Sequence, residues 1–197
     1  MIDFNFLEDF LFEDERVLLR PLEKSDIEHL LPFALNEPDI WKYSLVQPNS
    51  KENLISYIDQ TIKARKEEKE YPFIVFDKRT NEYAGSTRFY DIQLTNSTLQ
   101  LGYTWYGKNF QRTGLNRHCK FLLLQFAFDT MGFERVEFRA DNSNERSINA
   151  MKAIGCTVES ILRNNGVRAD GTRRDSIILS ILKNEWNEKI RTTYRIN

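Results

Sequence analysis

The residues Gln111-Arg112-Thr113-Gly114-Leu115-Asn116 lie between an expected strand and the start of a long apolar helix. A helix start exposes unpaired backbone N–H groups and a positive dipole end, and a glycine lets a bulky anion approach the backbone closely. Arg112 could add a direct ionic contact. The loop therefore suits a pyrophosphate. A glycine in a loop is nevertheless more often a plain turn residue, and the loop fits neither a Walker A sequence nor the three-glycine dinucleotide fingerprint.

Helical periodicity is found on both sides of this loop. A capping box formed by Ser25 and Glu28 marks one helix start, and apolar residues recur at helical spacing after Ser50. Residues 115–131 are apolar on more than one face, which predicts a heavily buried helix. Four helices are expected: from Asp26 to a kink or end near Pro32, from Ser50, over residues 115–131, and from an Asn144 cap to Gly155.

Strand patterns fill most of the remaining chain. Val136, Phe138 and Ala140, for example, alternate with charged residues as a half-buried strand requires. Strands are expected at residues 17–22, 71–77, 83–90, 98–106, 135–140, 157–163 and about 174–182, with an exposed turn at 164–172. The resulting order, β α α β β β α β α β β, predicts one mixed α/β (α+β) domain, as the length of 197 residues also favours.

The composition is that of an ordinary globular protein, with 41% apolar and 29% charged residues. No stretch approaches the roughly 18 apolar residues that a membrane span requires. The 28 basic side chains nearly cancel the 29 acidic ones, so no overall positive field favours a nucleic acid. The first residues lack the basic and apolar regions of a signal peptide. We expect a cytoplasmic protein without a membrane partner and leave open a homodimer.

The cysteines and histidines are too scattered to form a recognisable metal or disulfide pattern. Cys119 and Cys156 are interpreted as buried thiols in a reducing compartment. His29 and His118 have no carboxylate or cysteine at ligand spacing, so each is expected to serve packing or to lie at the surface. The sequence therefore predicts no metal site.

A second motif follows the loop by about thirty residues, at Asn144-Glu145-Arg146-Ser147. By themselves Asn144 and Ser147 are explained as the cap and third residue of a helix. Together with strand 99–106, the 111–116 loop and the Gly155-Cys156 helix end, however, they resemble the GNAT superfamily of N-acetyltransferases. More narrowly, the chain resembles the RimJ/RimL-like branch of ribosomal-protein N-terminal acetyltransferases, in which three motifs recur. Here these motifs are Gly102-Tyr103-Thr104-Trp105, Arg112-Thr113-Gly114-Leu115-Asn116 and Glu185-Trp186.

The resemblance covers residues 16–186, with residues 1–15 as an N-terminal extension and 187–197 as a C-terminal tail. It implies a central, mostly antiparallel sheet of about seven strands that is splayed at the cofactor site and flanked by about four helices. It also implies acetyl-CoA as the cosubstrate. The residues that it assigns to cofactor binding are Trp105, Gln111, Arg112, Thr113, Gly114, Leu115, Asn116 and Asn144. Ser147 is implied as the group that protonates the departing thiolate, for which a hydroxyl is chemically adequate.

Two positions depart from the family pattern. Asn116 replaces the usual glycine or alanine, which the closer branch tolerates, and Gln100 stands where related strands often carry glutamate. An amide cannot accept a proton at neutral pH. The proton of the amine would then pass to water or to another carboxylate such as Glu137 or Asp141, or the amine would bind already neutral. Water and a neutral amine are favoured.

The leading functional hypothesis is direct transfer of an acetyl group to an amine in a ternary complex, with backbone N–H near Trp105 stabilising the oxyanion. The acceptor could be a small molecule or a protein N-terminus. An alternative is an acyl-CoA-binding module without turnover, for which the absence of a base at Gln100 is the best argument. A third is a ribosome- or tRNA-associated protein that uses a basic patch. That patch would consist of Arg163, Arg168, Arg173 and Arg174.

Overall fold

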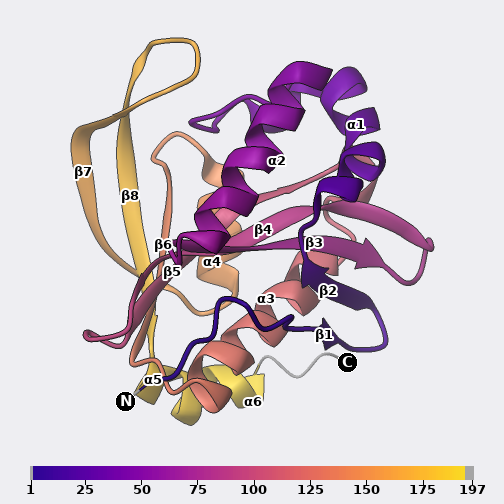
Figure 1. The fold of residues 1–197 in the computed structure, drawn as a ribbon. Helices are drawn as coiled ribbons and strands as arrows, with labels where there is room; N and C mark the ends of the chain where they lie inside the picture. The colour runs from indigo at the N-terminus through magenta and orange to yellow at the C-terminus, as the bar shows by residue number, and fades with distance from the viewer. Residues whose placement is uncertain (1, 194–197) are drawn as a thin grey trace.

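A computed structural model describes residues 2–193 and shows one mixed α/β fold built on an eight-stranded sheet (Figure 1). The strands lie in the order β1-β2-β3-β4-β5-β6-β8-β7, and of the neighbouring pairs only β5 and β6 are parallel. Their bounds are β1 Phe12–Glu13, β2 Val17–Pro21, β3 Glu70–Asp77, β4 Glu82–Gln93, β5 Thr98–Tyr106, β6 Arg135–Asp141, β7 Thr157–Val167 and β8 Arg173–Leu182. The predicted fold class and element order are confirmed, with the two-residue β1 added.

Helices cover both faces of the sheet. The longer ones are α1 Ile27–Asn36, α2 Lys51–Lys66, α3 Leu115–Gln125 and α4 Glu145–Ala153, followed by the short α5 Lys183–Glu185 and α6 Arg191–Thr193. One buried cluster joins α1 and α2 to the sheet through Leu30, Leu54 and Ile74. A larger cluster on the other side contains α3, α4 and the C-terminal turns. In Figure 1, β7 and β8 stand at a steep angle to β3 and β4, which shows the strong twist of the sheet.

The sheet opens between its two parallel strands. β5 and β6 pair only from Thr98 to Gln100 and from Arg135 to Glu137, although both strands continue well beyond this point. A bulge in the pairing of β4 with β5 adds to the opening, and Tyr103 adopts a positive φ of 48° there. The expected splay of the sheet is therefore confirmed. It leaves the backbone of the second half of β5 without a partner strand on the β6 side.

The first helix differs from the prediction at both ends. Its start is organised by Asp26, not by Ser25 and Glu28: the Asp26 carboxylate accepts the Glu23 N–H at 2.8 Å and pairs with Arg20. A short 3₁₀ turn over Lys24–Asp26 then leads into α1. The helix also continues past Pro32 to Asn36, whose side-chain amide donates to the Pro32 carbonyl at 2.9 Å. An internal proline removes only one backbone donor, and packing of α1 against α2 compensates for that loss.

Two other boundaries also differ from expectation. The buried helix is α-helical only to Gln125 and ends in a π turn, Phe126–Thr130, whose residues Phe126 and Phe128 remain buried. Strand β7 extends to Val167, so the expected turn at 164–172 shrinks to residues 168–172. That turn is closed by the Arg168 N–H, which donates to the Thr172 carbonyl at 2.8 Å. The expected helix start at Ser50 is confirmed, because its hydroxyl accepts the Asn53 N–H.

The segment that precedes β1 packs into the main core. Phe4 and Phe6 are each 5% exposed, and Phe4 contacts the rings of Tyr71 and Phe126. Trp186 and Ile190 are buried at the other end of the chain. Residue 1 and residues 194–197, which belong to the predicted extension and tail, lie outside the described residues. No helix among residues 2–193 is both long and apolar enough to cross a membrane.

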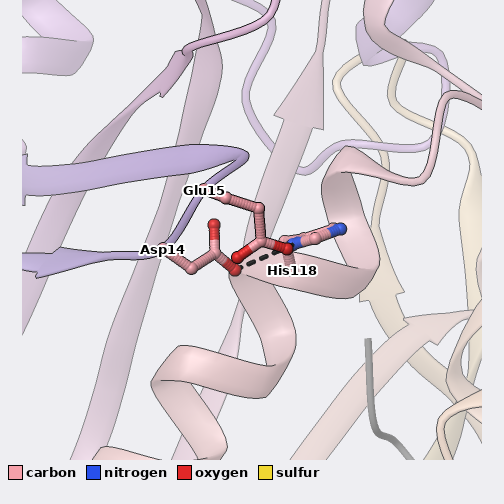
Figure 2. A group of neighbouring side chains, drawn as sticks. All are labelled: Asp14, Glu15 and His118. Atoms are coloured by element: carbon pink, nitrogen blue, oxygen red, sulfur yellow. Dashed lines mark hydrogen bonds and ion pairs between the residues drawn. The ribbon is translucent and has the colours of Figure 1, made fainter. Parts of the chain in front are cut away.

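A histidine links the turn between β1 and β2 to α3 (Figure 2). His118 Nδ1 lies 2.7 Å from Asp14 Oδ2 and 3.9 Å from a Glu15 carboxylate oxygen. The other oxygen of Asp14 accepts the backbone N–H groups of Arg16 and Val17, so this carboxylate also caps the turn. The sequence offers no carboxylate at ligand spacing from His118, and this partner could not be found in that way because it lies 104 residues away in the chain. The contact fixes the first turns of α3 against the sheet edge.

Candidate functional site

A cavity of about 830 Å³ occupies the opening between β5 and β6. The loop before α3, the first turn of α4 and residues of β4 and β5 line it. This volume is within the range of small-molecule and cofactor sites. Of the residues that the sequence assigned to the site, those whose atoms line this cavity are Trp105, Gln111, Arg112, Gly114, Asn116, Asn144 and Ser147.

The loop presents its backbone to the cavity. Gly114 has a φ of 89°, and a Cβ atom added to it would meet nothing within 4 Å. Arg112 also has a positive φ, 62°. In the described part of the chain, the backbone N–H groups of Arg112, Thr113, Gly114 and Asn116 form no hydrogen bond within the protein. Unpaired N–H groups at a helix start are donors of the kind that phosphates accept hydrogen bonds from.

The two remaining loop residues turn their side chains away from the cavity. Thr113 donates its hydroxyl to the Phe110 carbonyl at 2.8 Å, and Leu115 is fully buried in the main core. Only their backbone amides could therefore meet a ligand. Gln111 holds the loop to β5 through a 2.8 Å hydrogen bond from its amide nitrogen to the Tyr106 carbonyl. Its amide oxygen accepts a hydrogen bond from Arg146 of α4, so the two motifs are joined directly.

Asn144 and Ser147 form the cap of α4 and also line the cavity. The Asn144 side-chain oxygen accepts the Ser147 backbone N–H at 3.2 Å, which confirms the predicted helix cap. Both side chains also line the cavity. The cap uses the backbone of Ser147 and not its hydroxyl. The hydroxyl is therefore available to a ligand while the cap holds α4 in place.

Gln100 lies at the point where β5 and β6 separate, and it contacts a carboxylate that the sequence analysis missed. Its amide nitrogen donates to Asp91 Oδ2 at 2.7 Å, whereas its amide oxygen is buried and has no partner among the described residues. Asp91 is exposed, has a φ of 46° and lies within an irregularity in the pairing of β4 with β5. Both residues line the cavity. The irregularity that turns Asp91 toward Gln100 leaves no mark in the sequence.

The two carboxylates that the sequence offered as bases are both engaged. Burial acts to raise the pKa of Asp141, but hydrogen bonds from Arg168 and Ser143 outweigh it and lower that pKa to about 2. Glu137 accepts hydrogen bonds from Arg135 and Arg139 at 2.9 and 2.6 Å and does not line the cavity. Neither group is placed to take a proton from a substrate at neutral pH.

A family model described as "Acetyltransferase (GNAT) domain" matches residues 16–157. The chain belongs to the GNAT family. The resemblance that the loop and the Asn144 turn suggested is confirmed, and the splayed sheet is the fold that it implied. The protein is thus an enzyme of the N-acetyltransferase class.

The similar proteins are also named as N-acetyltransferases. "Uncharacterized N-acetyltransferase p20" of Bacillus licheniformis is 25% identical over 177 residues, which cover 87% of this chain and 96% of the relative. YdaF of Bacillus subtilis (strain 168), described as a proposed ribosomal N-acetyltransferase, is 28% identical over 102 residues, or 52% and 55% of the two chains. A GCN5-related N-acetyltransferase from Brucella melitensis has a similar solved structure, with a TM-score of 0.87 and 26% identity over 97% of this chain and 86% of the other. The similarity to YdaF agrees with the expected RimJ/RimL-like branch.

The cavity of this GNAT domain also contains a buried lysine that the sequence analysis did not single out. Lys120 of α3 is 5% exposed, and its Nζ donates to Thr104 Oγ1 at 2.8 Å and to Thr87 Oγ1 at 3.4 Å. Burial lowers its pKa to about 8, against smaller opposing effects of Cys119 and Cys156. Its position inside an apolar helix predicted only burial. No local pattern indicated that its ammonium would reach the splayed strands.

Aromatic side chains and an arginine form another part of the cavity lining. Tyr43, Tyr57 and Tyr103 line it, together with Arg174. Arg174 donates to the Tyr43 carbonyl at 3.2 Å, and its Nε is buried without a partner in residues 2–193. Trp105 is 6% exposed and packs edge-on against Trp41. These aromatic and polar groups differ in chemistry from the backbone donors of the loop.

The cysteines are buried thiols, as expected. Burial raises the pKa of Cys119 and that of Cys156 to about 12, so neither is a thiolate at neutral pH. A covalent intermediate on either sulfur is therefore disfavoured.

Only one of the four arginines of the basic patch, Arg168, pairs with a carboxylate among the described residues. Arg168 pairs with Asp141, Arg173 bonds Asn164, and Arg174 contributes to the cavity.

Proposed function

We propose that the protein is an acetyl-CoA-dependent N-acetyltransferase that transfers the acetyl group directly to an amine. The observation that carries the proposal is the set of free backbone N–H groups around Gly114, which open into a cavity that continues between β5 and β6. A nucleotide pyrophosphate fits these donors, and the splay offers a path for an extended pantetheine arm. The fit is supported by Arg112 and Arg146, which line the same end of the cavity.

The chain offers groups for each charge that the reaction creates. The amine attacks the thioester carbonyl carbon, the C–S bond breaks, and the sulfur leaves with the electron pair. Between Gly102 and Trp105 the β4 pairing skips a residue, so backbone N–H groups near Trp105 can turn toward the developing oxyanion. Ser147 faces the same cavity and can give its proton to the thiolate, after which solvent restores the hydroxyl.

Asp91 is the proton acceptor that we favour over Glu137 and Asp141. It lines the cavity, and its partners, Gln93 and Gln100, are neutral amides that leave its negative charge uncompensated. Because Asp91 is exposed, it can act directly or through one water molecule. The Gln100 amide then holds the Asp91 carboxylate in position and is not itself the proton acceptor.

The acceptor amine is a small molecule or a protein N-terminus, as the mixed aromatic and polar end of the cavity permits. A ribosomal-protein acceptor is supported by the similarity to YdaF, which is named as a proposed ribosomal N-acetyltransferase. We propose that the reaction takes place in the cytoplasm. The alternative of a non-catalytic acyl-CoA-binding module keeps one argument, the missing carboxylate at Gln100, which Asp91 weakens.

The decisive experiment compares Gly114→Asp with Gly114→Asn. Both side chains tolerate the positive φ about equally, but only aspartate places a negative charge beside the loop amides. Calorimetry should show CoA binding to wild type, a moderate loss for Gly114→Asn and no binding for Gly114→Asp. Folded Gly114→Asp with wild-type CoA affinity would overturn the proposed site. Release of free thiol from acetyl-CoA with a panel of amines then separates an enzyme from a binding module, which would bind CoA without turnover.

A further inference from the structure

Lys120 holds a charge that no other group in the described structure neutralises. Its Nζ has three N–H donors, and the protein partners are two threonine hydroxyls, Thr104 and Thr87. Among residues 2–193, no carboxylate lies within 4.0 Å of this nitrogen. The titratable groups that face it are the thiols of Cys119 and Cys156, which burial keeps protonated. The ammonium is therefore buried, hydrogen-bonded and unpaired.

Such an arrangement is not explained by stability. A buried charge without a counter-ion is costly, and an apolar residue of similar volume usually serves a core better. The two threonine hydroxyls lie 2.7 Å from each other and would remain hydrogen-bonded without the lysine. Perturbed ionisable groups of this kind concentrate at functional sites. A ligand that brings a negative charge would resolve the imbalance.

The location of Lys120 indicates where that negative charge arises. The residue projects from the second turn of α3 toward the opening in the sheet, where Thr104 of β5 binds it and the ring of Phe138 of β6 lies 5.9 Å away. It lines the same cavity as Gly114 and Ser147. Its partner Thr104 lies on β5 between Gln100, where the two strands separate, and Tyr106, where the strand ends before the loop. In the proposed reaction, this is the region where the thioester bond breaks.

We propose that Lys120 is a further catalytic residue, whose ammonium stabilises the CoA thiolate as it leaves. The inference rests on the proposed function. The electron pair of the C–S bond passes to sulfur, and Lys120 keeps its own proton and supplies the opposite charge. The proton that finally neutralises the sulfur comes from Ser147 or from water. The hydrogen bonds to Thr104 and Thr87 hold the ammonium in place, so no reorganisation is needed at the moment of reaction.

The test compares CoA with desulfo-CoA, which lacks the sulfur, by calorimetry from about pH 6 to about pH 9, a range that spans the ordinary titration of a thiol. If Lys120 binds the thiolate, wild type should prefer CoA increasingly as the pH rises toward about 8, by about tenfold or more, because a shift of one unit in the thiol pKa is tenfold in affinity. The preference should fall again at higher pH, where Lys120 loses its own proton in the free protein. Lys120→Met should bind both ligands with equal affinity at every pH. Lys120→Gln, which keeps a polar group, should behave in the same way.

Lys152→Met is the matched control, because Lys152 is an exposed lysine of α4 and its loss leaves the cavity unchanged. This variant should retain the preference for CoA. Equal binding of both ligands by wild type at all pH values, or a preference that survives in Lys120→Met, would overturn the role of Lys120 while the cofactor site stands. Failure of wild type to bind either ligand would instead overturn the proposed function.

Discussion

The side chain of Ser147 can be tested separately from its backbone. The Asn144 cap uses only the Ser147 N–H, so Ser147→Ala should leave α4 and the affinity for CoA nearly unchanged. Turnover should fall by about 10²- to 10⁴-fold if no water replaces the lost proton donor. Single-turnover kinetics with acetyl-CoA and an active amine measure the effect. Full turnover while chemistry is rate-limiting would reduce Ser147 to a helix-turn residue.

Lys120 has a predictable effect on stability. Its pKa of about 8 in the folded protein is below its ordinary value of 10.5, so between these values the unfolded chain binds more protons than the folded one. The contribution of Lys120 to the free energy of unfolding should therefore become more favourable as the pH rises through this range. The penalty is fully present below about pH 8 and corresponds to up to about 3 kcal/mol.

Lys120→Met removes this penalty and should be more stable than wild type at neutral pH. The advantage should shrink as the pH rises through the same range. Urea unfolding of both proteins at about pH 7 and about pH 10 measures the difference. Lys152→Met, which changes an exposed lysine, should match wild type at both pH values. An advantage of Lys120→Met that does not change with pH would indicate improved packing and no charge effect.

The helices, strands and helix caps that depend on local periodicity can be predicted from the sequence. Strand β5 was predicted with its observed bounds, and the α3 start, the Ser50 cap and the Asn144 cap follow from residues within one turn of each other. Contacts between distant segments could not be predicted in this way. The hydrogen bond of His118 to Asp14 and that of Gln100 to Asp91 depend on strand register and on a bulge, neither of which has a local signal.

The N-terminal segment gives a test at this scale. Phe4 is almost fully buried among aromatic rings of β3, β4 and the turn after α3, whereas Leu7 is 76% exposed. Phe4→Ala should lower the free energy of unfolding by about 3–5 kcal/mol, and Leu7→Ala should change it by less than about 0.5 kcal/mol. Chemical denaturation measures both. Equal effects of the two substitutions would show that residues before β1 do not contribute to the core.

Across the whole molecule, the distribution of charge matters more than its sum. The chain has a net charge of −1, yet among residues 2–193 six basic side chains and two carboxylates line the cavity. The basic residues are Arg112, Arg117, Lys120, Arg139, Arg146 and Arg174, and the acidic ones are Asp91 and Asp141. Arg168 already neutralises Asp141. The cavity therefore favours a polyanionic cosubstrate, and Asp91 is its single unpaired carboxylate among the described residues.

The role of Asp91 can be separated from that of the solvent by the pH dependence of kcat/KM for two amines of different pKa. If Asp91 takes the proton, both wild-type profiles should level off at the same pH, because that pH belongs to the enzyme. Asp91→Asn keeps the shape and the contact with Gln100 but cannot accept a proton, so its two profiles should each follow the pKa of the amine. Asp39→Asn, at an exposed residue outside the cavity, should behave as wild type.

Gln100→Glu completes the argument, because it would place a second carboxylate about where the Gln100 amide now contacts Asp91 at 2.7 Å. Two like charges at that distance cannot both ionise easily, so the pair should hold a proton to higher pH. The profile of Gln100→Glu should then level off at a higher pH than that of wild type, by the same amount for both amines. Once the pair is ionised, turnover of the more basic amine should increase most, because the carboxylate pair is a stronger base and accepts the proton of this amine more readily. The opposite result is that each wild-type profile already follows the pKa of its amine and that neither Asp91→Asn nor Gln100→Glu changes it. The proton then goes to water or the amine binds in its neutral form, and the Asp91 carboxylate only positions Gln100.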